Sequence, residues 1–247
     1  MNGSLHAIGL AQLAVGLIPV AAVLVILWRW SLGCGNALYA IVRMLVQLLL
    51  VGFVLTSIFE SNSPWIVTLV LAIMLASASW IALRTAGGRR RRLYGRALMA
   101  ISIGGGVALV FLTQGVLRLD PWFTPRYVVP LGGMVFANAM NSVSLAAERF
   151  YAERGRGEGW VEARGRAMKA ALIPITNSLF AVGLVSLPGI MTGQILSGVS
   201  PLIAVRYQIV VMCMVFTSAG LSAAVFLAQL ARLERTETEA GARQRSV

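Results

Sequence analysis

Neutral polar side chains occur at helical spacing within one otherwise apolar stretch of this sequence. Successive helical turns would place three of these residues, Asn138, Asn141 and Ser142, on one face together with Met134. Amide and hydroxyl groups in an apolar segment need partners. They either bond to neighbouring helices, where each contact contributes about 1 kcal/mol, or line the path of a solute. The spacing alone leaves both interpretations open.

A second stretch, residues 185–201, combines helix-breaking residues with polar ones inside an apolar region. Lipid cannot satisfy the backbone groups that Pro188 and the nearby glycines free, so protein or a water-filled cavity must cover them. Broken helices of this kind build solute sites in transporters. The alternative is a helix that ends at Leu187 and continues as a structured external loop.

Arg43 and Gln47 lie one turn apart within a third apolar segment. A charged side chain inside a membrane span is costly and marks a functional site by default. Arg43 is also within about two turns of the end of the segment, from which a long side chain can reach the headgroups. Function and snorkelling both remain possible for this pair.

The elements that would position these residues are membrane spans. The chain has 247 residues, of which 58% are hydrophobic and 12% charged, with a mean hydropathy of +0.80. These values predict an all-α integral membrane protein. We expect one transmembrane domain, residues 1–231, followed by a charged and disordered tail, 232–247. Seven segments are long enough to cross a hydrocarbon core of roughly 30 Å: 7–27, 37–59, 64–83, 97–117, 127–146, 173–196 and 206–231.

Basic residues gather in alternate connections of this arrangement. They fill residues 84–96, 149–169 and the tail, while the opposite connections carry few. The positive-inside rule therefore predicts an amino end outside and a carboxyl end in the cytoplasm. The arginine run at 89–92 is better explained as a topogenic loop than as a nucleic-acid or anionic-lipid patch.

The connection at residues 147–172 predicts one amphipathic helix at the cytoplasmic interface. Four charged residues share one stripe, and Trp160 lies on the other side with small residues; the stripe is Glu158, Glu162, Arg166 and Lys169. Such a helix either anchors the loop or transmits motion from a separate ATPase.

Small residues predict close helix contacts. Gly104, Gly105 and Gly106 lie in the fourth segment, and the last segment carries a four-residue repeat at Gly220, Ala224 and Ala228. The contacts are either within one subunit or across a dimer.

Three motifs together resemble those of the FetB-type permeases, bacterial subunits assigned to ATP-driven iron export that are similar to plant permeases linked to aluminium tolerance. The motifs are Arg-Met-Leu-Val-Gln-Leu at 43–48, the run from Pro130 to Phe150, and Leu-Pro-Gly-Ile-Met-Thr-Gly-Gln-Ile-Leu-Ser-Gly at 187–198 followed by Tyr207 and Gln208. The likeness extends over about residues 36–228. It departs at Ile190, where the family usually has a methionine, which removes one soft metal ligand.

The resemblance implies the permease subunit of an ATP-binding-cassette transporter for metal ions such as iron, or for a metal chelate. It implies a homodimer in the lipid of a bacterial cytoplasmic membrane. Candidates for the transport path are Asn138, Asn141, Ser142, Pro188, Met191, Thr192, Gln194, Arg43 and Gln47, with Met191 and Met134 as metal contacts. Candidates for ATPase contact are Glu148, Arg149, Glu158, Trp160, Glu162 and Arg166.

An ATP site within this chain is not expected. A P-loop needs a lysine after a glycine, and the sole lysine, Lys169, follows Met168. We therefore expect no enzyme activity and no cofactor here, with ATP and Mg²⁺ held by a separate ATPase. The main alternative is an ATPase-independent secondary transporter or channel. All nine acidic residues fall in predicted loops or the tail, which disfavours a proton-coupled carrier.

Overall fold

The computed structural model describes residues 9–60 and 63–245, and in these ranges the elements are helices. One isolated bridge joins Val182 and Ser186. The prediction of an all-α protein is therefore confirmed. The helices form two compact units, one before residue 62 and one after residue 61.

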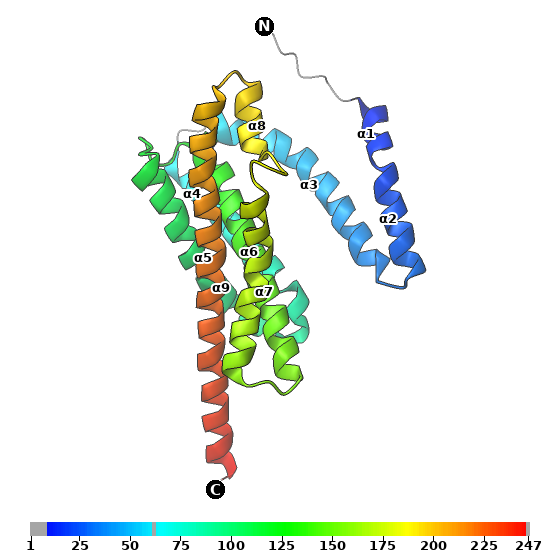
Figure 1. Cartoon of the computed structure of the whole chain (residues 1–247), viewed down its shortest axis with the longest axis vertical. Helices are drawn as coiled ribbons and strands as arrows, with labels where there is room; N and C mark the ends of the chain where they lie inside the picture. The colour runs from blue at the N-terminus through cyan, green and yellow to red at the C-terminus, as the bar shows by residue number, and fades with distance from the viewer. Residues whose placement is uncertain (1–8, 61–62, 246–247) are drawn as a thin grey trace. The chain divides into compact units, whose positions relative to one another are not determined.

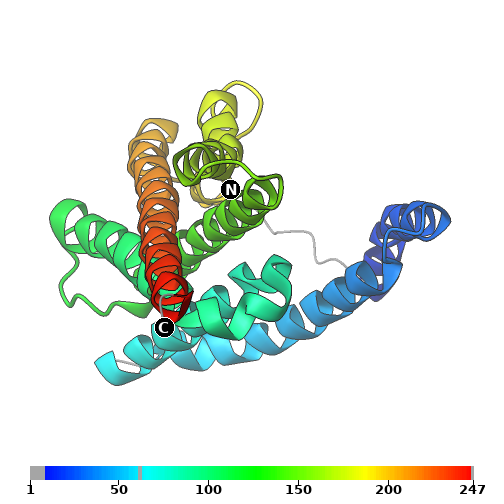
Figure 2. The same ribbon diagram turned by 90° about the horizontal axis from the view of Figure 1, so that it is seen from below.

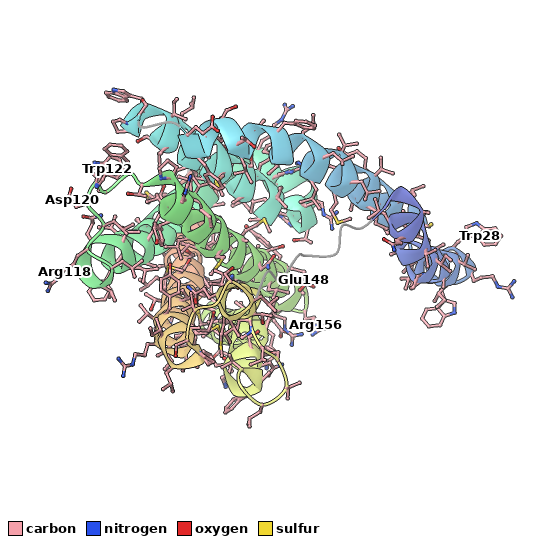
Figure 3. The ribbon with its side chains drawn as sticks, turned by 90° about the horizontal axis from the view of Figure 1, so that it is seen from above. Trp28, Arg118, Asp120, Trp122, Glu148 and Arg156 are labelled. Carbon is pink, nitrogen blue, oxygen red and sulfur yellow. The ribbon has the colours of Figure 1, made fainter. Side chains whose placement is uncertain are left out.

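The first unit consists of α1 (Leu10–Gly16), α2 (Ile18–Arg29) and α3 (Cys34–Glu60). α2 packs against α3, and Gly33 in the turn between them has a φ of +73°, which glycine adopts without strain. The Cys34 thiol donates to the carbonyl oxygen of Leu24 across this turn, at 3.5 Å. Trp28, near the end of α2, points away from the helix (Figure 3), as interfacial tryptophans do.

The second unit holds the remaining elements, which are α4 (Pro64–Ala82), η1 (Arg84–Arg89), α5 (Arg90–Val110), η2 (Phe111–Val116), α6 (Pro125–Gly155), α7 (Trp160–Ala181), α8 (Gly189–Leu196) and α9 (Pro201–Arg245). α6 packs against α4, α5, α7 and α9. α9 runs along α5, α6 and α7 (Figures 1 and 2). The core of this unit therefore lies where α5, α6 and α9 meet.

Small residues bring these helices together. Gly104 of α5 faces Ser222 of α9 so closely that a Cβ atom at position 104 would overlap the serine, backbone included. Gly105 packs closely on α6, because a Cβ atom at position 105 would lie 3.0–3.1 Å from side-chain atoms of Phe136 and Val135. Gly106 faces open space instead. The predicted close contact is thus confirmed for two of the three glycines.

The small-residue repeat of the last span lies elsewhere. Ala224 and Ala228 are exposed and Gly220 is half-buried, while the buried face of α9 carries Ala219, Ala223 and larger residues. The repeat is therefore not the surface on which α9 packs within this subunit.

Six helical segments in the described residues are long and apolar enough to cross a membrane. They correspond to six of the seven predicted segments. The remaining one, 173–196, is not a single helix. α7 ends at Ala181, whose carbonyl oxygen accepts bonds from the N–H groups of residues 184–186, and Gly183 has a φ of +82°. After this break Pro188 precedes the short helix α8.

The predicted interfacial helix at 147–172 is also corrected. Its first part is the end of α6, its last part is the start of α7, and the two antiparallel helices join at residues 156–159. Three residues of the charged stripe, Glu162, Arg166 and Lys169, thus belong to one long helix whose other half is apolar, and Glu158 lies in the join before it. The sequence alone does not separate the two cases, because the charged end of a long helix and a short interfacial helix both show a few turns of amphipathic pattern.

The basic connections gather at one end of the second unit. Arg89 lies over the ring of Tyr151, with 4.6 Å from the guanidinium carbon to the ring centre, which places η1 beside the last turns of α6. Arg118, Asp120 and Trp122 belong to the connection before α6, at its opposite end (Figure 3). Within this unit the structure therefore agrees with the charge segregation expected from the sequence.

The segment expected to form a disordered tail is helical as far as it is described. α9 continues without interruption from Pro201 to Arg245. Residues 246 and 247 lie outside the described residues.

Candidate functional site

A cavity of about 220 Å³ lies where α6, α7 and α9 meet the break before α8. Its lining includes the polar or sulfur-containing residues Met134, Asn138, Ser178, Gln208 and Met212, together with Pro188. Among the described residues, none that lines this cavity carries a charge. The polar groups of the site are therefore neutral amides, a hydroxyl and thioethers, set among the aliphatic side chains of Ile175, Ile190, Val211 and Val215.

Gln208 is the unusual residue of this cavity. Its side chain is 5% exposed, and its Oε1 atom is buried without a hydrogen-bond partner. A buried acceptor left unpaired costs about 1–3 kcal/mol. Such a group in a native protein needs an explanation, and an unfilled ligand position is one.

Two other polar side chains of the cavity use their donors locally. Asn138 Nδ2 donates to the carbonyl oxygen of Met134 at 2.9 Å, and Ser178 Oγ donates to that of Pro174 at 3.0 Å. The Asn138 amide oxygen and the Ser178 lone pairs are left as acceptors. The cavity therefore offers acceptors to a ligand, which suits a cation or a hydrogen-bond donor.

A second cavity, of about 330 Å³, adjoins the first along α9. Gln208 and Met212 line both cavities, and the second also reaches Met191, Gly183 and Cys213. One turn of α9 therefore forms a wall that the two spaces share. The described residues that line this second cavity are likewise uncharged.

The polar residues predicted to share one face of α6 lie in three different surroundings. Asn138 lines the first cavity, but Ser142 is buried and its Oγ donates to the carbonyl oxygen of Ala171 on α7, at 3.3 Å. Asn141 is exposed on another side of α6. Ser142 thus makes the interhelical hydrogen bond that was the alternative to lining a path.

Of the transport-path candidates in residues 185–201, some line a cavity and others do not. Pro188 lines the first cavity and Met191 the second. Thr192 Oγ1 donates back to the carbonyl oxygen of Pro188 at 3.2 Å. Gln194 lines neither cavity, although its Oε1 atom is buried without a partner.

Arg43 and Gln47 belong to α3 of the first unit and are exposed there. They lie one turn apart on that helix, as their spacing predicts.

Sequence reasoning missed Gln208 and Met212 as cavity residues. They are four residues apart on α9, which puts them on one face. A glutamine in an apolar span was the available indication, but the sequence does not show that it faces the same space as Asn138.

A separate ionic cluster holds the turn between α6 and α7. Glu153 is fully buried and pairs with three arginines: Arg149 at 2.6 Å, Arg156 at 3.1 Å and Arg166 at 2.5 Å. Arg166 also reaches Glu158 at 2.7 Å. Its hydrogen bonds to Glu153 and Glu158 raise the pKa of Arg166, so the guanidinium stays charged at physiological pH.

This cluster contains three of the predicted ATPase-contact residues, Arg149, Glu158 and Arg166, around a residue that was not predicted, Glu153. Trp160 Nε1 is buried without a partner, and Arg164 lies over the Trp160 ring at 4.5 Å. Glu148 and Glu162 are exposed. The turn therefore combines a buried ionic centre with an exposed charged surface.

A preformed site for a hard metal is not seen in the described part of the chain, where no group of three His, Cys, Asp or Glu side chains could hold an ion. The two uncharged cavities and the ionic turn remain the features that a function must use.

The six membrane-length helices of the described residues define a multi-pass membrane protein. The chain belongs to the UPF0014 family, described as an uncharacterised protein family, whose model matches residues 10–164 and 156–233.

The chain aligns with its relatives over most of their length. A Synechocystis membrane protein of this family is 34% identical over 217 residues, which cover 82% of this chain and 84% of the relative. The Arabidopsis protein ALUMINUM SENSITIVE 3 is 34% identical over 232 residues, 87% of this chain and 83% of its own. The probable iron export permease protein FetB of Escherichia coli is 31% identical over 237 residues, 88% of each. No solved structure matches the chain.

Proposed function

We propose that this chain is the permease subunit of a metal-ion exporter driven by a separate ATPase of the ATP-binding-cassette class. The relative named as a probable iron export permease supports this proposal because it matches the chain nearly from end to end. The observation that carries it is the uncharged cavity beside the helix break, with the unpaired Gln208 acceptor in its wall.

The break itself supports a moving element. Residues 182–188 interrupt the path from α7 to α8, and Leu184, Val185 and Leu187 are exposed there. A non-helical stretch is tolerated at membrane depth only where it borders protein or a cavity, and this one borders both cavities through Pro188 and Gly183. Rearrangement at the break would open or close the space around Gln208.

The ATPase would contact the turn between α6 and α7. Both helices are continuous from this turn to the cavity, since Asn138 and Arg149 lie on α6 and Arg166 and Ser178 lie on α7. The Glu153 cluster ties the two helices together at that end. A push on the turn would therefore move both helices as one body.

The proposal includes a membrane orientation and an assembly. The basic end of the second unit would face the bacterial cytoplasm, as the positive-inside rule expects, and two copies of the permease would form the transporter. The ATPase would bind ATP and Mg²⁺.

The test is reconstitution in liposomes with the candidate ATPase. We expect this chain to stimulate ATP hydrolysis and to support ATP-dependent movement of a metal ion across the bilayer. Liposomes with the ATPase alone, and with this chain alone, are the controls. If no ATPase associates and a solute still moves down its gradient, the chain is a carrier or channel.

A further inference from the structure

We infer that Met134, Asn138, Gln208 and Met212 form a binding site for a soft monovalent cation of the Cu(I) or Ag(I) class. The inference names the class of substrate that the cavity would take, and its relevance to transport rests on the proposed function. Binding itself requires neither an ATPase nor transport.

The site consists of two matching pairs on facing helices. Met134 and Asn138 are four residues apart on α6, and Gln208 and Met212 are four residues apart on α9. All four line the same cavity. Each helix therefore contributes one thioether and one amide from successive turns of one face.

The amides are arranged to accept. Asn138 Nδ2 donates one of its two N–H groups to the Met134 carbonyl oxygen, and the Asn138 amide oxygen is left as an acceptor. Gln208 has a buried Oε1 atom without a partner. A bound cation would satisfy that oxygen, which explains an otherwise unfavourable buried group.

The charge of the ion follows from the charge of the lining. The penalty for removing an ion from water rises with the square of its charge, and buried ions are stabilised only by compensating groups. Among the described residues that line the two cavities there is no carboxylate, imidazole or ammonium group. A free divalent or trivalent ion would therefore be poorly stabilised, whereas a monovalent ion suits neutral donors.

The softness of the ion follows from the sulfur atoms. Thioethers favour soft cations such as Cu(I), while hard cations favour carboxylate and water oxygens. The second cavity continues the same chemistry, because Met212 lines both spaces and Met191 lines the second. A soft cation could pass from one thioether to the next along this wall.

Ile190 offers a gain of function. It lines the first cavity beside Pro188, so Ile190→Met would add a third thioether. The two side chains are similar in volume, and such exchanges are well tolerated. Tighter binding of a soft cation is expected in this variant and would not arise from damage to the fold.

The experiment is a titration of the purified full chain in detergent with Ag(I), followed by NMR of ¹³C-labelled methionine methyl groups. Cys34→Ser and Cys213→Ser are introduced together so that thiols do not compete. We expect saturation at one equivalent, with shifts of the Met134 and Met212 methyl signals. Met134→Leu and Met212→Leu should each weaken binding at least about tenfold, and Ile190→Met should strengthen it. Met99→Leu, at an exposed position of α5, is the matched control.

Three results would overturn the site. They are no saturable shift, equal shifts at Met99 and in the cavity, and binding that is seen with the cysteines present but lost without them. Tighter binding of Fe(II) than of Ag(I) under anaerobic conditions would overturn the class of ion. If Ag(I) binds as expected but reconstituted transport fails, the site stands and the permease proposal falls. If transport occurs without Ag(I) binding, the permease proposal stands and the site falls.

Discussion

Arg166 of α7 donates a hydrogen bond to the buried carboxylate of Glu153 on α6, and so joins the two helices across their turn. Arg149 and Arg156 contact the same carboxylate. One acidic side chain thus organises three basic ones, in a protein whose net charge is +12. Its burial is tolerable because every partner is cationic.

Glu153→Gln is expected to lower the melting temperature of the purified protein. The neutral amide removes the charge that holds three guanidinium groups together, and they then repel one another. The measurement is thermal unfolding in detergent at low salt. Glu148→Gln, at an exposed position of the same helix, should leave the melting temperature unchanged. Equal melting temperatures for both variants would mean that the cluster does not stabilise the turn.

Gly104→Ala is expected to destabilise the contact between α5 and α9 by about 1–3 kcal/mol, the range for overpacking a filled core. The added methyl group would meet the backbone of Ser222, which cannot rotate away. Gly106→Ala is the matched control, since open space surrounds that position. Unfolding by denaturant in mixed micelles compares the two. A destabilised Gly106 variant would instead indicate that a second copy packs there.

Glu162→Arg is expected to weaken association with the ATPase. Glu162 is exposed in the first turn of α7, so a reversed charge changes the surface of the turn more than its interior. Loss of an acidic residue at a helix amino end costs about 0.3–1 kcal/mol, which a parallel melting curve would detect. Co-purification with the ATPase is the measurement. A complex that forms equally well would leave the turn as an anchor only.

The helical fold and the break were predictable from composition and from the Gly and Pro residues of 183–201. The positions of the helix ends were harder to predict, because α7 continues through Pro174 and ends at Ala181, well before Pro188. The site was predictable in part. Asn138 and Ser142 lie one turn apart and were predicted to share a face. Asn138 lines the cavity, whereas Ser142 donates a hydrogen bond to a carbonyl oxygen of α7. Only the packing of neighbouring helices decides between such positions.

The last prediction distinguishes a path inside one subunit from a path between subunits. Asn138 lines the cavity of the second unit, whereas Asn141, less than one turn away, is exposed. With a path inside the subunit, Asn138→Leu abolishes ATP-dependent transport in liposomes, because it removes an acceptor and fills the cavity, while Asn141→Leu retains it. With a path between two copies, Asn141→Leu is the damaging change, since its exposed face would border the partner. Both variants must insert and co-purify with the ATPase as the wild type does. Full transport in both would exclude this part of α6 from the path and leave Gln208 and Met212 of α9 without a polar counterpart on the facing helix.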